Sequence, residues 1–275
     1  MKTGPAGSML GLAKSAPGKQ FGLMATPPYG NDFFDWVDRS AARSARGFVP
    51  LLAGLLGPTS VLDVGCGRGA WLRTWIGQPG VHRIKGVDGD YVDTSKLVIP
   101  EERFGIVDLE SGFSLGEWFD LVQCLEVAEH LSPAAGPKLI ASLARHGDAV
   151  LFSAAPPGQG GEFHINEREP EYWRSLFVEQ GYQMYDSVRR LVAGIRSIDP
   201  WYRYNTFVFC RPETATRLGI AADLVPAGRD VPRCEPWPWR VRKQLLKRLS
   251  PEIVTRLSRA KYQITNRVSA VRPAD

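Results

Sequence analysis

The sequence has few cysteines, and they are widely separated. Cys66, Cys124, Cys210 and Cys234 form no C-x-x-C pair within the 275 residues, so the spacing offers no thiolate zinc site and favours a reduced protein. No run approaches the roughly 20 apolar residues of a membrane span. Residues 1–20 also lack the continuous apolar core of a secretory signal. We therefore expect a cytoplasmic protein.

Acidic residues are scarce at the carboxyl-terminal end. From Pro236 to Asp275 there are ten Lys and Arg residues against two acids, so this segment has a net charge of +8. Because the whole chain has a net charge of +5, the remaining residues have a net charge of −3. The high pI of about 9.1 therefore reflects this tail and says nothing about the substrate of the main domain.

The basic tail also has an apolar pattern. Ser250-Pro251 suits the start of a second helix, and the apolar residues recur at helical spacing: Leu246, Leu249, Ile253 and Leu257. A basic amphipathic helix near tryptophans predicts peripheral binding to an anionic membrane, such as the inner membrane face. Two alternatives remain open, a helix packed on the main domain and a nucleic-acid contact.

The composition along the chain predicts four segments. Residues 1–30 are rich in Gly, Pro, Ala and Ser without an apolar period, and are predicted to form a flexible lead. Residues 31–212 form the main domain, residues 213–238 a linker, and residues 239–275 the basic helical tail.

The main domain alternates short apolar runs with helical patterns. We predict buried strands at 60–65, 83–88, 104–108, 118–124 and 149–153, helices at 35–56, 70–76, 137–145 and 170–180, and two final strands at 183–188 and 204–211. This alternation predicts an α/β fold with a doubly wound, mostly parallel seven-stranded sheet and right-handed crossovers. The absence of a helical pattern between the last two strands favours an antiparallel terminal hairpin.

A glycine-rich turn follows the first predicted strand. Gly65, Gly67 and Gly69 open the next helix, and without Cβ atoms they let the backbone turn tightly against a ligand. This pattern predicts a nucleotide site at the carboxyl edge of the sheet. A dinucleotide is an alternative, but Asp63 would repel a pyrophosphate, whereas it suits a cofactor that carries an ammonium and a sulfonium.

Acids at the ends of the next strands complete this pattern. Asp88 could accept both hydroxyls of a ribose, and Asp108 could accept an adenine amino group. With Val-Leu-Asp-Val-Gly-Cys-Gly-Arg-Gly, Gly-Val-Asp, Val-Asp-Leu-Glu and Phe-Asp-Leu-Val-Gln-Cys-Leu-Glu-Val in this order, residues 60–211 resemble the class I methyltransferases. The resemblance implies the cofactor S-adenosyl-L-methionine and these binding residues: Asp63, Gly65, Cys66, Gly67, Gly69, Asp88, Gly89, Asp108, Leu109, Leu125 and Glu126.

A second cluster follows the fourth predicted strand. Glu126, Glu129 and His130 are spaced to share one face of a helical turn, and His164 follows the fifth strand at the same sheet edge. The set resembles the divalent-metal site of small-RNA 3′-terminal 2′-O-methyltransferases and ubiquinone-biosynthesis O-methyltransferases. It implies Mg²⁺ or Mn²⁺. The alternative is a metal-free site in which His130 or His164 is the catalytic base.

The loop from Ser153 to Asn166 is rich in glycine and proline and is predicted to wall or cover the substrate pocket. Aromatic residues could line that pocket or pack elsewhere: Tyr172, Trp173, Trp201 and Tyr202. We predict methyl transfer to a hydroxyl of a small acceptor, such as a glycan sugar or a natural-product intermediate. The alternatives are the 3′-terminal ribose of an RNA, a nicotinamide dehydrogenase, and a catalytically silent scaffold that acts through its tail.

Overall fold

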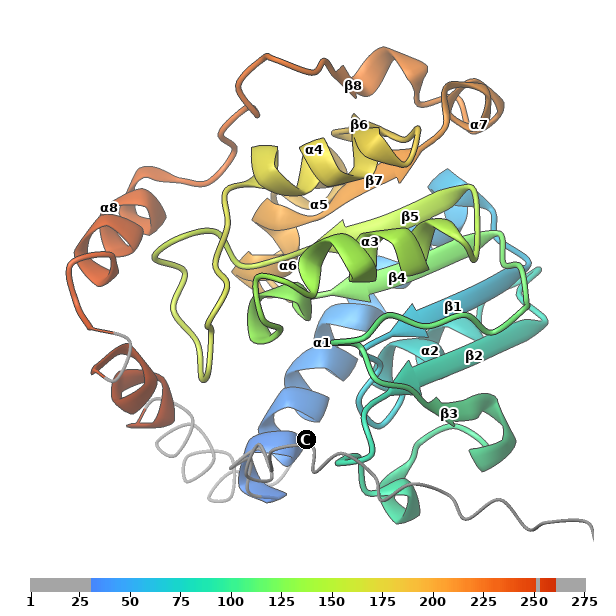
Figure 1. The fold of residues 1–275 in the computed structure, drawn as a ribbon, viewed down its shortest axis with the longest axis horizontal. Coiled ribbons are helices and arrows are strands. Elements are labelled where there is room, and N and C mark those ends of the chain that lie inside the picture. Colours follow the sequence, from blue (N-terminus) through green and yellow to red (C-terminus); the bar gives the residue numbers. More distant parts are fainter. Residues whose placement is uncertain (1–30, 251–252, 261–275) are drawn as a thin grey trace, which may run out of the picture.

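The described residues form one mixed sheet with helices on both faces (Figure 1). A computed structural model describes residues 31–250 and 253–260, so the predicted lead at 1–30 and the end of the predicted tail at 261–275 lie outside the described residues. The strand order is β3-β2-β1-β4-β5-β7-β6-β8. The sheet is doubly wound and mostly parallel, as predicted.

The parallel part of the sheet contains five strands, and their bounds are β1 (Ser60–Val64), β2 (Arg83–Asp88), β3 (Phe104–Ile106), β4 (Leu121–Leu125) and β5 (Ala149–Ser153). Every residue of β1, β4 and β5 is buried, which explains why these short strands are mostly apolar. The strand order changes direction at β1: β2 and β3 follow on one side of it, and β4 and β5 lie on the other. In α/β sheets, ligands bind at such a switch point, beyond the carboxyl ends of the strands.

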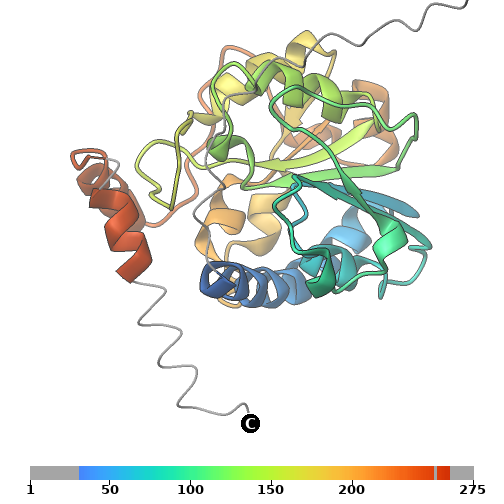
Figure 2. The same ribbon diagram turned by 60° about the horizontal axis from the view of Figure 1, so that its bottom comes forward.

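Helices cover the two faces of the sheet in separate layers (Figure 2). On one face pack α1 (Asn31–Leu56), α2 (Ala70–Trp75), α5 (Ser187–Val192) and α6 (Pro200–Asn205). On the other face pack α3 (Gly136–Ala144) and α4 (Pro170–Glu179). Short 3₁₀ helices lie in the connections: η1 (Thr94–Lys96), η2 (Glu101–Arg103), η3 (Ala128–His130) and η4 (Ala221–Asp223). The core between the sheet and the layer of α3 and α4 buries Phe177 and Phe209, whose rings stack 3.9 Å apart.

The antiparallel end of the sheet differs from the predicted hairpin. β6 (Gln183–Tyr185) and β7 (Phe207–Cys210) are antiparallel neighbours, as predicted. However, α5 and α6 connect them, and both strands are shorter than the predicted 183–188 and 204–211. Pro200, which favoured a loop in the sequence, occupies the first turn of α6, where its missing N–H is not needed. β7 also pairs with β5, so it lies inside the sheet.

The segment expected to be a linker contributes to the fold. α7 (Pro212–Arg217) follows β7 directly, and β8 (Leu224–Val225) pairs with β6 as an eighth strand. The predicted count of seven strands is therefore wrong by one. A strand of two residues is too short to produce a period in the sequence, which is why this pairing was missed.

The carboxyl-terminal part of the described chain forms an arm beside the domain. It consists of α8 (Trp237–Leu246), residues 247–250 and the helical residues 253–260. Two helices divided near Ser250-Pro251 were predicted, although α8 begins inside the expected linker. None of the helices in the described ranges is long and apolar enough to cross a membrane.

Candidate active site

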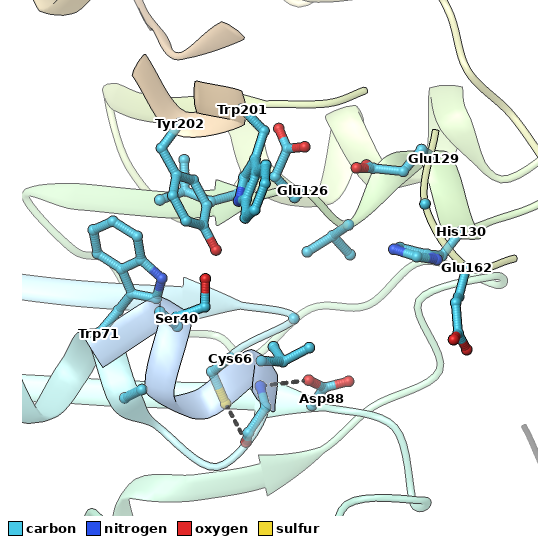
Figure 3. A pocket seen from close by; sticks show the side chains of 18 of the residues that line it. Ser40, Cys66, Trp71, Asp88, Glu126, Glu129, His130, Glu162, Trp201 and Tyr202 are labelled. Carbon is cyan, nitrogen blue, oxygen red and sulfur yellow. Dashed lines mark hydrogen bonds between the residues drawn. The ribbon is translucent and has the colours of Figure 1, made fainter. Parts of the chain in front are cut away.

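A cavity of about 280 Å³ opens at the carboxyl ends of β1, β2 and β4 (Figure 3). The glycine-rich turn after β1 and Asp88 form one side, and η3 with the loop after β5 forms another. Residues 37–41 of α1 and the first residues of α6 complete the lining. The cavity therefore brings both predicted clusters, the cofactor set and the Glu/His set, to one place.

The turn after β1 requires glycine for two reasons. Gly65 has φ +76, in the left-handed region that side chains rarely adopt. A Cβ atom there would also lie 2.3 Å from the side chain of Val127. The Gly65 N–H donates to the Val87 carbonyl at 2.8 Å, which fixes the turn against β2. The turn thus leaves its backbone facing the cavity at a position where no side chain fits.

Asp88, the last residue of β2, is hydrogen-bonded to this turn. Its carboxylate accepts hydrogen bonds from the backbone N–H groups of Gly67 and Gly89, each at 2.7 Å, and from the Tyr91 hydroxyl. Asp88 is buried, and burial raises its pKa above the ordinary value against these three hydrogen bonds. Asp88 therefore links the glycine turn after β1 to Gly89 and Tyr91, which follow β2.

Asp63 is the buried acid of the turn and keeps one oxygen without a partner. Its Oδ1 accepts a hydrogen bond from Gln123 Nε2 at 3.0 Å, while its buried Oδ2 has none among the described residues. Burial, opposed by the Gln123 hydrogen bond and reinforced by the charge of Asp88, raises the pKa of Asp63 to about 7. A cation placed beside Asp63 would offset the cost of burying its charge.

The predicted cofactor residues separate into two groups. Those that line the cavity are Asp63, Gly65, Cys66, Gly67, Asp88, Leu109, Leu125 and Glu126. Gly69, Gly89 and Asp108 lie outside its lining. Gly69 has φ +89 at the start of α2, and Gly89 donates to Asp88, so both shape the turn. Asp108 is exposed two residues beyond β3 and accepts from Glu110 N and Ser111 Oγ. Its contact with adenine stays a prediction.

Three residues of the predicted metal set meet at the other end of the cavity. Glu129, His130 and His164 each offer a ligand atom, and these atoms lie within 4.8 Å of one another. The imidazole rings of His130 and His164 meet edge to face at 4.9 Å. Both carboxylate oxygens of Glu129 are buried without a hydrogen-bond partner in the described structure. Figure 3 places Glu129 and His130 beside the cavity.

Glu126 does not join these three, in contrast to the predicted helical face. The residue has φ +57, and its N–H donates to the Ser153 carbonyl at 3.0 Å, so no helical turn includes it. The short helix η3 begins only at Ala128. Glu126 Oε2 instead accepts a hydrogen bond from Gln159 Nε2 at 2.5 Å, and Glu126 Oε1 is buried without a partner in the described structure.

Burial controls the protonation of this cluster. Burial and the neighbouring His164 lower the pKa of His130 to about 3, so its ring is neutral at physiological pH and keeps a lone pair. Burial and the charge of Glu126 raise the pKa of Glu129 well above its ordinary value. The imidazoles of His130 and His164, beside a carboxylate that needs a positive neighbour, form a donor set that can hold a divalent cation. Its identity as Mg²⁺ or Mn²⁺ stays a prediction.

The loop after β5 holds His164 against η3. His164 Nδ1 lies 3.0 Å from Glu167 Oε1, and the Glu167 carboxylate also accepts from the N–H groups of Gly158 and Gly160. The Glu129 carbonyl accepts from the N–H groups of residues 165 and 166. This loop lines the cavity with residues 159–162 and 164, so its predicted position as a wall of the pocket agrees with the structure.

The four aromatic candidates divide between the cavity and the core. Trp201 and Tyr202, both on α6, line the cavity beside Trp71. Tyr202 and Trp71 meet edge to face at 5.0 Å. Trp173 is buried against Phe152, and Tyr172 packs against the same core cluster, so neither lines the cavity.

Sequence reasoning missed several lining residues, namely Asp38, Ser40, Trp71, Tyr91, Gln159 and Glu162. Gln159 joins two other side chains, because its amide donates to Glu126 and accepts from Asn205 Nδ2 at 2.6 Å. Its position in the glycine-rich loop was the only available signal. Asp38 lies on α1 and pairs with Arg68 at 2.9 Å, a contact between residues 30 positions apart that no local pattern indicates.

Comparisons with known proteins support this reading of the fold. The profile of a family described as a methyltransferase domain matches residues 36–192, more than half of the chain. The structure is similar to the sugar N-methyltransferase KedS8 from Streptoalloteichus sp., with 18% identity, a TM-score of 0.50 and coverage of 74% of this chain and 99% of that one.

Two further solved structures are similar. The methyltransferase domain of bacterial CtHen1 shares 19% identity, with a TM-score of 0.47 and coverage of 62% of this chain and 98% of that one. An O-methyltransferase family protein from Burkholderia thailandensis shares 13% identity, with a TM-score of 0.48 and coverage of 65% and 59%. No curated protein sequence matches the chain.

Proposed function

This chain belongs to the methyltransferase domain family, and we propose that it transfers the methyl group of S-adenosylmethionine to a hydroxyl oxygen of a small acceptor. A sugar of a glycan or a natural-product intermediate is the acceptor class we favour. The observation that carries the proposal is the meeting of Glu129, His130 and His164 in the cavity that the glycine turn and Asp88 also line.

The cofactor supplies an electrophilic methyl group on a sulfonium. The residues of this chain would bind and orient it: the turn at Gly65 admits a ligand close to the backbone, Asp88 would accept ribose hydroxyls, and the unpartnered Oδ2 of Asp63 suits a positive group. Because methyl transfer is an in-line displacement, holding the acceptor in line with the methyl group supplies much of the rate.

The acceptor hydroxyl has to lose its proton during this reaction. In a metal-free site His130 or His164 would accept this proton, but the pKa of about 3 makes His130 a weak base at physiological pH. A divalent cation held by Glu129, His130 and His164 would supply positive charge that favours the deprotonated hydroxyl. An amine acceptor whose lone pair is already free needs neither a proton-accepting histidine nor a cation, which is why we propose an oxygen acceptor.

RNA is a weaker candidate acceptor for this cavity. Its lining includes six acidic side chains: Asp38, Asp63, Asp88, Glu126, Glu129 and Glu162. The acids among them that are ionised would repel a polyanion, and the described lining includes no Lys or Arg that could offset phosphate charge. A neutral hydroxylated acceptor meets no such penalty.

The proposed function is tested by methyl transfer from radiolabelled S-adenosylmethionine to three acceptor panels: neutral glycosides, amino sugars and a single-stranded RNA with a free 3′ end. We expect label on the glycosides and none on an RNA whose terminal ribose is otherwise accessible. Label confined to the amino sugars would contradict oxygen transfer. Label on the RNA would replace the small acceptor with a ribose.

Asp63 makes cofactor binding depend on pH. Its pKa of about 7 means that the free protein holds Asp63 protonated below that pH, whereas the ammonium of a bound cofactor favours the ionised form. The affinity for S-adenosylhomocysteine should therefore rise up to about tenfold per pH unit as the pH increases towards 7, and level off above it. Calorimetric titration at several pH values measures this dependence.

Asp63→Asn is the control, because asparagine has the same shape and does not titrate in this range. It should bind more weakly above neutral pH and show no rise with pH. A wild-type affinity that is flat between about pH 5 and 7 would show that Asp63 does not pair with the cofactor.

A further inference from the structure

The arm carries a row of apolar side chains that are exposed in the described structure. Trp237, Val241 and Leu245 follow each other at i, i+4 spacing along α8 and are 67%, 46% and 58% exposed. Leu249, Ile253 and Leu257 continue the exposed apolar set along the arm. Contiguous apolar surface of this kind is rare on soluble monomers and marks a site of interaction.

The predicted apolar face therefore has to be corrected. Leu246 was expected to share a face with Leu249, Ile253 and Leu257, but it is half-buried, and its Cδ1 lies 3.1 Å from where a Cβ on Gly160 would be. Leu246 faces the loop after β5, whereas the exposed row begins with Trp237 and passes through Leu245.

The exposed side of the arm also carries unpaired positive charge. Arg240, Arg248 and Arg256 are exposed, and within the described ranges no ion pair engages any of them. The described residues of the arm include no Asp or Glu. Within residues 237–250 and 253–260, the exposed side thus combines apolar side chains with arginine and carries no acid, whereas Glu252 lies outside the described residues. This combination indicates an anionic partner with an apolar interior.

The other side of the arm is already occupied by the cavity loop. Arg242 Nη1 donates to the Gln159 carbonyl at 2.7 Å, and Arg259 Nε lies 3.4 Å from Glu162 Oε2, whose residue is 5% exposed. Lys247 pairs with Glu169 at 3.2 Å. Figure 1 shows the arm beside this loop. These contacts fix which side of the arm remains free.

We propose that the free side of the arm binds the surface of an anionic lipid bilayer. Its apolar row enters the boundary between headgroups and acyl chains, and the three arginines contact lipid phosphates. A nucleic acid would satisfy the arginines but leave the row from Trp237 to Leu257 in water. A bilayer satisfies both features at once.

This contact places the cavity close to the membrane, since Arg242 and Arg259 hold residues that line it. In this part the inference rests on the proposed function: the acceptor hydroxyl is then one presented at the bilayer surface, such as a sugar carried by a lipid. The membrane contact itself requires no acceptor and no cofactor, so it is measured without either.

Sedimentation of the full chain with vesicles tests the proposal. We expect binding to vesicles of phosphatidylglycerol and phosphatidylcholine, weaker binding at high salt, and none to phosphatidylcholine alone. Val241→Asp should weaken vesicle binding by about tenfold or more, because it replaces an inserting side chain with a repelled charge.

Val178→Asp on α4 is a matched control, since Val178 is a helical valine with 45% exposure and the substitution changes the net charge equally. It should bind vesicles like the wild type, and thermal melting should show that both variants are folded. The proposal is overturned if the wild type ignores anionic vesicles, if both variants lose binding equally, or if the chain retains RNA but not vesicles. Each of these outcomes leaves methyl transfer to soluble acceptors unaffected.

Discussion

Glu129→Gln should lower the rate of methyl transfer by at least about 100-fold, because a divalent cation contributes several kcal/mol of charge stabilisation that one lost carboxylate would forfeit. Glu129 is fully buried, and both of its carboxylate oxygens lack a partner in the described structure. Burial and Glu126 raise its pKa, so the ionised carboxylate needs a cation beside it. The amide of glutamine keeps the shape and removes the charge.

Direct binding separates a metal site from a merely structural glutamate. Titration of the wild type with Mn²⁺ should give one site, which Glu129→Gln and His164→Ala weaken while the affinity for S-adenosylhomocysteine is unchanged. EDTA should abolish activity, and Mg²⁺ or Mn²⁺ should restore it. Glu179→Gln, an exposed position on α4, controls for the lost charge. Full activity in excess EDTA would exclude the metal and leave the histidines as acid and base candidates.

The parallel half of the fold could be predicted because each strand combines burial with a turn signal. In β1 the apolar run of residues 60–64 is buried throughout and ends at Gly65, whose backbone requires glycine. The acids at 63 and 88 follow from the same regularity, since parallel strands end at one edge of the sheet. In this half of the sheet, a residue at the end of a predicted strand can therefore be placed, from the sequence alone, at the edge of the sheet that holds the cavity.

The antiparallel half depends on contacts that leave little trace in sequence. α5 and α6 have six residues each, which is less than two turns and too short for a helical period to be recognised. β8 has two residues, and its pairing with Met184 and Tyr185 involves positions about 40 residues away. Tertiary packing determines these elements more than local preference does.

The Glu/His cluster was predicted from residue spacing and a family resemblance, and three of its four residues meet in the structure. The spacing of Glu126, Glu129 and His130 suits one helical face, but Glu126 adopts a left-handed conformation and its N–H donates to Ser153 on the adjacent strand. A backbone conformation that glutamate rarely adopts cannot be inferred from a pattern of residue types. The same limit applies to Gln159, whose two side-chain partners come from distant parts of the chain.

Asp88→Asn should weaken binding of S-adenosylhomocysteine by roughly ten- to a hundredfold, because a hydrogen bond to a charged acceptor is worth about 1.5–3 kcal/mol. Asp88 accepts from the N–H groups of Gly67 and Gly89 and from the Tyr91 hydroxyl. Asparagine retains one acceptor oxygen and turns an NH₂ group towards donors, so both the ribose contact and the support of the glycine turn are impaired.

Asp90→Asn is the matched control, since Asp90 is exposed two residues further along and loses the same charge. It should bind S-adenosylhomocysteine like the wild type. Tyr91→Phe separates the two roles of Asp88, because it removes only the hydroxyl that donates to the carboxylate and leaves the N–H groups of Gly67 and Gly89 in place. The affinity should stay unchanged, or rise if a ribose hydroxyl replaces the Tyr91 hydroxyl. Calorimetry and thermal melting measure affinity and folding together. An Asp88→Asn variant that is folded and binds with wild-type affinity would remove Asp88 from the cofactor site.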